Sequence, residues 1–274
     1  MQIVTRTSAL ILLTSCAEIS KLQDDLSELT NSFVLAGFHL GAEAFSDDAF
    51  LSPEQTEELM ASSVQSLAFL LEGDLTGLET SGPIAGAELN VISGSTSTTL
   101  AEQEAGLYTS PPSAMEYAPG QDVVFQSSYG GVERSISVLQ PSAPEYDLPE
   151  SHAQSAELTI DLSGQAFDSA LVVVSDISSG ELTYSNEPTG FDEIYSMTHT
   201  NTDENGEQIE ISEVSIPANA FSNEGAYLIG VAGLKNSDPE TMIEMNIALS
   251  SLSAGQFGFD VVCVPDCMTV AQSQ

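Results

Sequence analysis

Short apolar segments of strand type, separated by turn residues, follow one another along most of this chain. From residue 84 onward they recur about every ten residues and are bounded by clusters of Gly, Pro or Ser. Up to residue 139 the expected strands are 87–93, 106–109, 115–117, 122–127 and 135–139, with a turn-rich run over 94–99. Many short strands at this spacing predict a β-sandwich or small barrel rather than alternating strands and helices.

A second series of strands begins after residue 156. Leu158, Ile160 and Leu162 alternate with polar residues, as in a strand with one buried face. Asn205-Gly206 is the strongest two-residue hairpin signal in the chain. The other expected strands are 170–174, 193–198, 208–216, 227–233, 242–250 and 257–264. Such a set suits an immunoglobulin-like sandwich, although the chain contains no Trp.

The region before residue 63 has a helical pattern instead. Apolar residues recur at helical spacing in residues 17 to 45, at Leu22, Leu26, Leu29 and Phe33. Residues 38–40 could alternatively form a short strand, because Gly37 and Gly41 weaken a helix. Ser52, Pro53 and Gln55 form a capping signal, which predicts a helix over 53–62 followed by a strand.

The first sixteen residues carry a lipoprotein signal. Arg6 supplies the positive charge, a short apolar run follows, and the sequence from Leu13 to Ser15 leads into Cys16. The run is far shorter than the ~20 residues that span a bilayer. We therefore expect residues 1–15 to be removed and Cys16 to become the lipidated N-terminus, with two or more acyl chains to make the anchor stable.

These features predict a mainly β protein with two β-sandwich domains, transthyretin-like or immunoglobulin-like, after a short helical part. Pro141, Pro144 and Pro149 fall within twelve residues and indicate a semi-rigid linker. The predicted parts are the signal peptide 1–15, the anchor, tether and helical segments 16–62, the first sandwich 63–140, the linker 141–151 and the immunoglobulin-like sandwich 152–274.

Charge is the unusual feature of the composition. The chain has 41 acidic and four basic residues, a net charge of −37; loss of Arg6 with the signal would leave −38. Such a field repels phosphate backbones, so nucleic acid is excluded as a partner. High salt or bound divalent cations would offset the self-repulsion, and a solvated acidic face without a specific partner is the alternative.

Three cysteines agree with an oxidising compartment. Once Cys16 is lipidated, Cys263 and Cys267 remain as a closely spaced pair, for which we predict a local disulfide. A metal or redox role for this pair is less favoured, because no His or second Cys pair lies nearby in the sequence. His39, His152 and His199 are scattered and are predicted to be ordinary surface or core residues.

One loop has the composition of a calcium site. Asn201, Asp203 and Asn205 place oxygen side chains at alternate positions before Gly206, as in calcium-binding loops. Ser212 stands where such loops have a bidentate Glu, and Glu213 comes one position late. A hairpin turn explains Asn205-Gly206 without an ion and is the preferred interpretation, with Ca²⁺ as the alternative.

Three short motifs carry a resemblance to a known class. They are residues 83–91 (PIAGAELNV), 106–108 (GLY) and 117–120 (YAPG). In these the chain resembles secreted lipoproteins of predatory and marine Gram-negative bacteria, which have a transthyretin- or carboxypeptidase-regulatory-like sandwich after the anchor. The resemblance covers about seventy residues and implies a structural or adhesive module without an active site.

The sequence thus predicts a non-enzymatic, lipid-anchored binding or structural module of the bacterial cell envelope. Its expected partners are the membrane, through the anchor, and envelope proteins or surface glycans, through loops at the sandwich ends. Ala17, rather than Asp, follows Cys16, which favours the outer membrane. A secreted hydrolase is the alternative, but among 41 carboxylates the sequence cannot nominate a catalytic pair.

Overall fold

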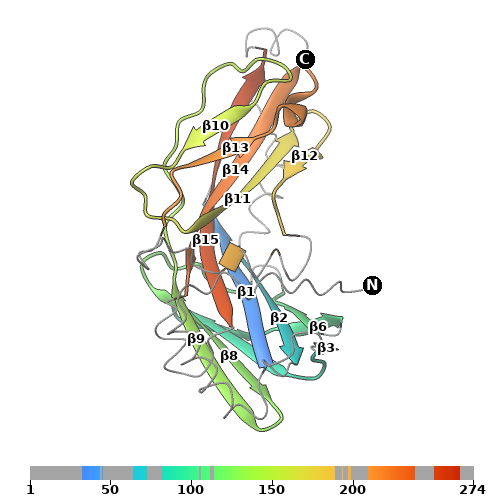
Figure 1. Ribbon diagram of the computed structural model, residues 1–274, viewed down its shortest axis with the longest axis vertical. Helices are drawn as coiled ribbons and strands as arrows, with labels where there is room; N and C mark the ends of the chain where they lie inside the picture. The colour runs from blue at the N-terminus through green and yellow to red at the C-terminus, as the bar shows by residue number, and fades with distance from the viewer. Residues whose placement is uncertain are drawn as a thin grey trace, which may run out of the picture.

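The computed structural model describes residues 33–43, 45, 64–72, 82–104, 106–111, 114–188, 193, 197–198, 209–237 and 250–265. In this part the chain is mainly β, as predicted, and its strands build two sandwich-like lobes stacked end to end (Figure 1). The N-terminal lobe contains the strands from β1 to β9, the C-terminal lobe contains those from β10 to β14, and β15 contributes to both.

One nine-stranded sheet extends through both lobes. Its order is β12-β11-β14-β15-β1-β2-β7-β6, with β3 attached to β2 (Figure 1). The strands are β1 (Phe33–Ala42), β2 (Val64–Glu72), β3 (Gly82–Pro83), β6 (Ala101–Glu104), β7 (Leu107–Thr109), β11 (Ser169–Asp176), β12 (Glu181–Ser185), β14 (Gly225–Asn236) and β15 (Ser251–Val264). The fourteen residues of β15 cover roughly 46 Å at the usual rise of a strand. The last described strand therefore belongs to both lobes.

The N-terminal lobe is a sandwich closed by a four-stranded sheet. That sheet has the order β5-β4-β8-β9, from Thr96–Thr99, Glu88–Ser93, Asp122–Tyr129 and Val132–Leu139. Alternate residues of β4 and β8 are buried, as expected for strands with one face on a core. Leu252 and Ala254 of β15 lie in the same core as Leu35 and Phe125. The N-terminal lobe is thus completed by residues near the other end of the sequence.

The C-terminal lobe has immunoglobulin topology. Strands β10 (Leu158–Asp161) and β13 (Glu213–Ile216) pair antiparallel and face the four strands in the order β12-β11-β14-β15. This is the arrangement in which strands B and E oppose strands C′, C, F and G. Ile160, Val172, Ile229 and Val262, one from each of four strands, are fully buried in the core between the two sheets. The immunoglobulin-like prediction for this part of the chain is confirmed.

A tyrosine corner marks the connection into β14. The 3₁₀ helix η3 (Ala218–Phe221) lies between β13 and β14, and Tyr227 is the third residue of β14. The Tyr227 hydroxyl donates to the Asn223 carbonyl at 3.0 Å and accepts from the Asn223 amide at 3.1 Å. Antibody domains place a disulfide cysteine two residues after this Tyr. Here Ile229 occupies that position, so apolar packing replaces the inter-sheet disulfide.

Replacing Tyr227 by Phe should lower the free energy of unfolding by about 1–2 kcal/mol, because the Asn223 amide and carbonyl then lose a buried partner. Tyr184→Phe, in a half-buried ring against the same core, is the matched control and should change stability less. Urea titration at constant pH measures both. Equal losses in the two variants would show that the hydroxyl of Tyr227 contributes nothing special.

Most of the predicted strands are present, and four local predictions are wrong. Residues 33–42 form a strand instead of continuing a helix, so the alternative strand predicted over 38–40 is the one observed, and it is longer because β15 and β2 pair with it on both sides. Residues 96–99 form β5 rather than a turn. Residues 115–117 form no strand, because the hydroxyl groups of Ser93 and Thr96 bind the backbone of Glu116. Residues 193, 197 and 198 are helical rather than extended. The predicted helix 53–62 and strand 242–250 lie outside the described residues, apart from Ser250.

Candidate functional site

Most residues predicted to carry chemistry lie outside the described part of the chain. These are Cys16, Asn201, Asp203, Asn205 and Cys267. Cys263 is described, and it is fully buried in β15 opposite Ala226. The lipid anchor, the calcium loop and the Cys263–Cys267 disulfide therefore remain predictions. Within the described residues no three His, Cys, Asp or Glu side chains gather as a metal site would require.

The proline-rich segment 141–151 lies along the sheet. The Tyr146 hydroxyl donates to the carbonyl of Gly258 at 2.9 Å and lies 3.2 Å from that of Ile229, while burial raises the pKa of this Tyr. Gly258 leaves room for the segment, since a Cβ there would lie 3.3 Å from the Pro144 carbonyl oxygen. His152 donates its amide to the Cys263 carbonyl at 2.8 Å. The connection between the lobes is thus hydrogen-bonded to β14 and β15 at Ala143, at Tyr146 and at His152, directly after the segment.

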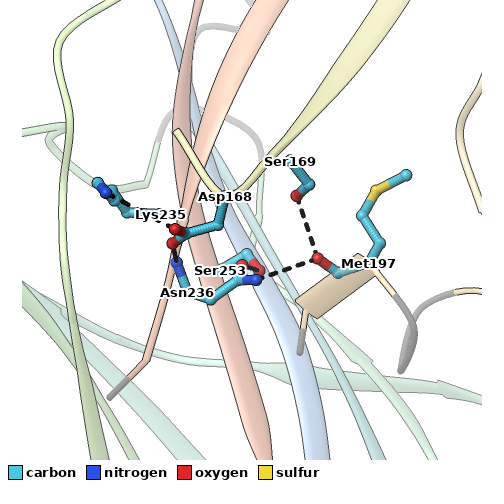
Figure 2. Close-up of polar contacts among 6 residues, drawn as sticks. All are labelled: Asp168, Ser169, Met197, Lys235, Asn236 and Ser253. Atoms are coloured by element: carbon cyan, nitrogen blue, oxygen red, sulfur yellow. Dashed lines mark hydrogen bonds and ion pairs between the residues drawn. The ribbon is translucent and has the colours of Figure 1, made fainter. Parts of the chain in front are cut away.

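A polar cluster lies where the lobes meet, and we call it the junction cluster. Figure 2 shows its members, which come from the start of β11, the end of β14, the start of β15 and one helical residue: Asp168, Ser169, Met197, Lys235, Asn236 and Ser253. Asn236 donates its amide to Asp168 Oδ2 at 2.7 Å, and Lys235 Nζ lies 3.7 Å from Asp168 Oδ1. The side chains of Ser169 and Asn236 both donate to the Met197 carbonyl.

The contacts of the junction cluster matter for stability because Asp168 is buried. The Asp168 side chain is 1% exposed, so its charge needs the amide of Asn236 and the ammonium group of Lys235. The Lys235 side chain is 24% exposed and keeps some contact with water. The carboxylate of Asp168 therefore joins the start of β11 to the end of β14, and the Ser253 hydroxyl, which donates to the Asn236 side chain, adds the start of β15 to the cluster. This geometry suits a structural lock, because the atoms of Asp168 are enclosed by their partners.

A second polar group lies inside the N-terminal sandwich around His39, in β1. His39 is fully buried; its Nδ1 lies 2.8 Å from Ser66 Oγ, and its Nε2 has no hydrogen-bond partner. The ring stacks on Tyr117 with a centroid distance of 5.4 Å. Gly41 makes this possible, because a Cβ there would lie 2.4 Å from the Tyr117 ring.

Burial controls the protonation of His39. Because the charged imidazolium would be cut off from water, burial lowers the pKa of His39 to about 4, and a nearby Gln140 side chain offsets only part of this. The ring is therefore neutral at physiological pH. Burial also raises the pKa of Tyr117, so the stacked pair is uncharged and behaves as part of the core.

The sequence predicts His39 to be an ordinary surface or core residue, and the core alternative is the one observed. The surroundings of His39 were not predicted, although the sequence contains a signal for them. Gly37, His39 and Gly41 alternate along β1 and so share one face, where Gly37 lets β2 approach closely and Gly41 leaves room for the Tyr117 ring. The junction cluster had no comparable signal, because Asp168 and Lys235 are 67 positions apart.

The sequence motifs 83–91 and 106–108 meet in the structure. Tyr108 donates its hydroxyl to the Ile84 carbonyl at 2.9 Å and accepts from the Ala87 amide at 3.0 Å. This contact fixes the loop before β4 against β7 and places Tyr108 in the core. The contact is structural, and the family resemblance built on these motifs stays an expectation.

Comparison with known proteins gives no family. No family model matches the chain, and no curated protein matches it. Among solved structures, a chimeric titin Z1Z2-Z1Z2 tandem aligns with 85% of this chain and 98% of its own at 12% identity and a TM-score of 0.20. Domains 4 and 5 of the S-layer protein SbsC align over 86% and 98% at 14% identity and a TM-score of 0.23. Domains IG1 and IG2 of DIP-gamma align over 86% and 97% at 10% identity and a TM-score of 0.20.

Among the described residues, no helix is both long and apolar enough to span a membrane.

Proposed function

We propose that this protein is a lipid-anchored, non-enzymatic module of the bacterial cell envelope that holds an immunoglobulin-like lobe away from the membrane. The observation that supports this best is the continuous sheet. β15 pairs with β14 in the C-terminal lobe and with β1 in the N-terminal lobe, so the two lobes form one elongated body (Figure 1). Such a body suits display or spacing better than it suits chemistry.

The position of β1 gives the body an orientation. The chain reaches β1 at Phe33, and β1 begins at the end of the molecule opposite the C-terminal lobe (Figure 1). A tether from Cys16 would enter there. The N-terminal lobe would then lie nearer the membrane, with the C-terminal lobe pointing outward.

The loops of the C-terminal lobe divide between its two ends. The β10–β11 loop, the end of β14 and the start of β15 lie at the junction cluster, next to the N-terminal lobe. The loops at the far end are exposed and polar over residues 153–155, 178–180 and 222–224. Loops on a rigid scaffold are the usual place for partner binding. We propose these outer loops as the contact with an envelope protein or a surface glycan.

The chemistry of the partner follows from charge. A chain of net charge −37 favours partners with basic surfaces, or glycans bound with the help of cations. The proposal includes the Cys263–Cys267 disulfide, which suits an oxidising compartment. The hydrolase alternative has no observation in its favour among the described residues.

The anchor is the part of the proposal to test first. Protein purified from its native membrane should have an intact mass that lacks residues 1–15 and includes a diacylglyceryl group and a further acyl chain, and it should partition into a detergent phase. A Cys16→Ala variant should keep the mass of the unprocessed chain and remain in the aqueous phase. Native protein that begins at Met1, carries no acyl group and stays aqueous would remove the anchor from the proposal.

A further inference from the structure

We propose that β1 carries mechanical tension between the membrane anchor and a partner held at the outer end of the C-terminal lobe. The inference rests on the proposed function for the source of the load. The resistance of the fold to that load is inferred from strand geometry alone.

β1 is clamped on both sides. Residues 36–42 pair in parallel with 251–257 of β15, seven register pairs in all. Residues 33–41 pair antiparallel with 72–64 of β2, nine register pairs in all. A strand with a neighbour on each side has no free edge from which it can be peeled sideways.

The direction of the load makes these pairs act together. Tension from the N-terminal side enters β1 at Phe33, its first residue, and draws the strand along its own axis. Hydrogen bonds between strands run across that axis, so both ladders are loaded in shear and share the force. Tension applied across the strand ends would instead open the pairs one after another. A pull from the anchor therefore acts in the direction in which the pairing of β1 is strongest.

Side chains prevent the strand from slipping to a new register. A shift by one residue would turn Leu35 and Phe38 to the wrong faces, although each is buried in a different cluster. A shift by two residues toward the N-terminus would bring His39 to the position of Gly37. A Cβ at that position already lies 2.6 Å from the Leu67 carbonyl oxygen, so no larger side chain fits without moving β2. The same shift would bring Glu43 to the position of Gly41, where the ring of Tyr117 leaves no room for a side chain.

The load then passes into the C-terminal lobe through the longest strand pair. β15 pairs with β14 over Ser253 to Val264, twelve register pairs. The junction cluster and the segment 141–151 add hydrogen bonds at the same place. β14 starts at the outer end of the lobe, where Gly225 pairs with Val264, so a partner bound there would pull on β14 in shear as well.

Single-molecule force spectroscopy on the chain 16–274, without lipid, tests the strand directly. One handle is attached at residue 16. The other is attached through azidophenylalanine placed at either of two exposed positions, Glu224 at the outer end or Ala85 beside β3 near the start of β1. The first pair of handles loads β1 in shear and the second opens it from its end. We expect the rupture force to be severalfold higher with the handle at 224 than at 85.

The two proteins differ only in the exposed position that carries the second handle, so equal unfolding midpoints in urea would show that a difference in rupture force comes from the pulling direction and not from stability. Equal rupture forces in the two geometries would overturn the proposal. Phe38→Ala, which weakens the buried side of β1, should lower the force measured from 224 and leave the force measured from 85 nearly unchanged; a drop in neither geometry would also overturn it. Because the chain is not lipidated, failure of the anchor in the mass measurement would leave this result unaffected, and the two proposals can fail separately.

Discussion

Acidification from pH 7 to pH 4 should lower the free energy of unfolding by about 3 kcal/mol through one buried side chain, His39. The imidazole is fully buried, its Nε2 has no hydrogen-bond partner, and burial lowers its pKa to about 4 from the ordinary value of 6.5. Protonation inside the sandwich would leave a charge among Ser66, Met115 and Tyr117, none of which is acidic.

The sign follows from the two pKa values. Between pH 6.5 and 4 the unfolded chain binds a proton on His39 and the folded chain does not, so falling pH favours unfolding in this window. Above pH 6.5 the contribution to stability is complete, and below pH 4 it is lost. Protonation of carboxylates acts in the opposite direction at the lower end of the window, because it reduces repulsion in a chain with 41 acidic residues. The effect of His39 must therefore be measured as a difference between proteins.

Urea titrations at pH 7, 6, 5 and 4 and constant ionic strength provide that difference. His39→Phe keeps an aromatic ring against Tyr117 but cannot bind a proton, so the gap between wild type and variant should change by about 3 kcal/mol across the range. His152→Gln is the matched control, since His152 is only half buried and contacts the Ala156 carbonyl. A pH dependence that survives in His39→Phe would assign the acid sensitivity to other groups.

The strands of this fold could be predicted where burial alternates along the chain. β10 shows the pattern of one buried face, and the sequence alternation from Leu158 to Leu162 indicated it directly. β1 could not be predicted in the same way. Residues 34–39 are all buried, because one face meets the sandwich core and the other meets the junction, so no alternation is left to detect. The helical spacing that ends at Phe33 then extended the predicted helix too far.

The order of the strands in the large sheet could not be predicted from local sequence patterns. The pairing of β1 with β15 joins Ala36 to Ser251 across more than two hundred residues of sequence, and in parallel. Short-range signals such as Asn-Gly turns specify hairpins between neighbours only. A pairing between strands at opposite ends of the sequence depends instead on how all the strands of both lobes pack together. The sequence therefore predicted two sandwiches without predicting that they share a strand.

The candidate sites show the same limit. Each consists of single residues brought together from distant parts of the sequence, so spacing along the chain could indicate a crowded face of β1 at Gly37, His39 and Gly41 but could not identify the partners. His39 gained its surroundings from β2 and from the loop before β8. Asp168 gained its partners from the end of β14.

Replacing Asp168 by Ala should destabilise the protein by about 3 kcal/mol, because it leaves the Asn236 amide and the Lys235 ammonium without their buried acceptor. Asp168→Asn should cost less, since the amide oxygen can still accept from Asn236 while Lys235 turns toward the water it already reaches. Both variants remove one negative charge from a strongly acidic chain, so relief of repulsion is equal in the two. Their difference isolates the hydrogen bond.

The location of the loss is as informative as its size. Hydrogen exchange should quicken in both variants at the ends of β14 and β15 that meet at the junction, around Asn236 and Ser253, and more in the Ala variant. Glu181→Ala, an exposed carboxylate lost from the same lobe, is the matched control and should leave this region protected. If Asp168→Ala were no more destabilising than Glu181→Ala, or if exchange quickened only at the outer end of the C-terminal lobe, the buried carboxylate would not be what stabilises the place where the two lobes meet. The continuous sheet and the bound segment 141–151 would then hold them without it.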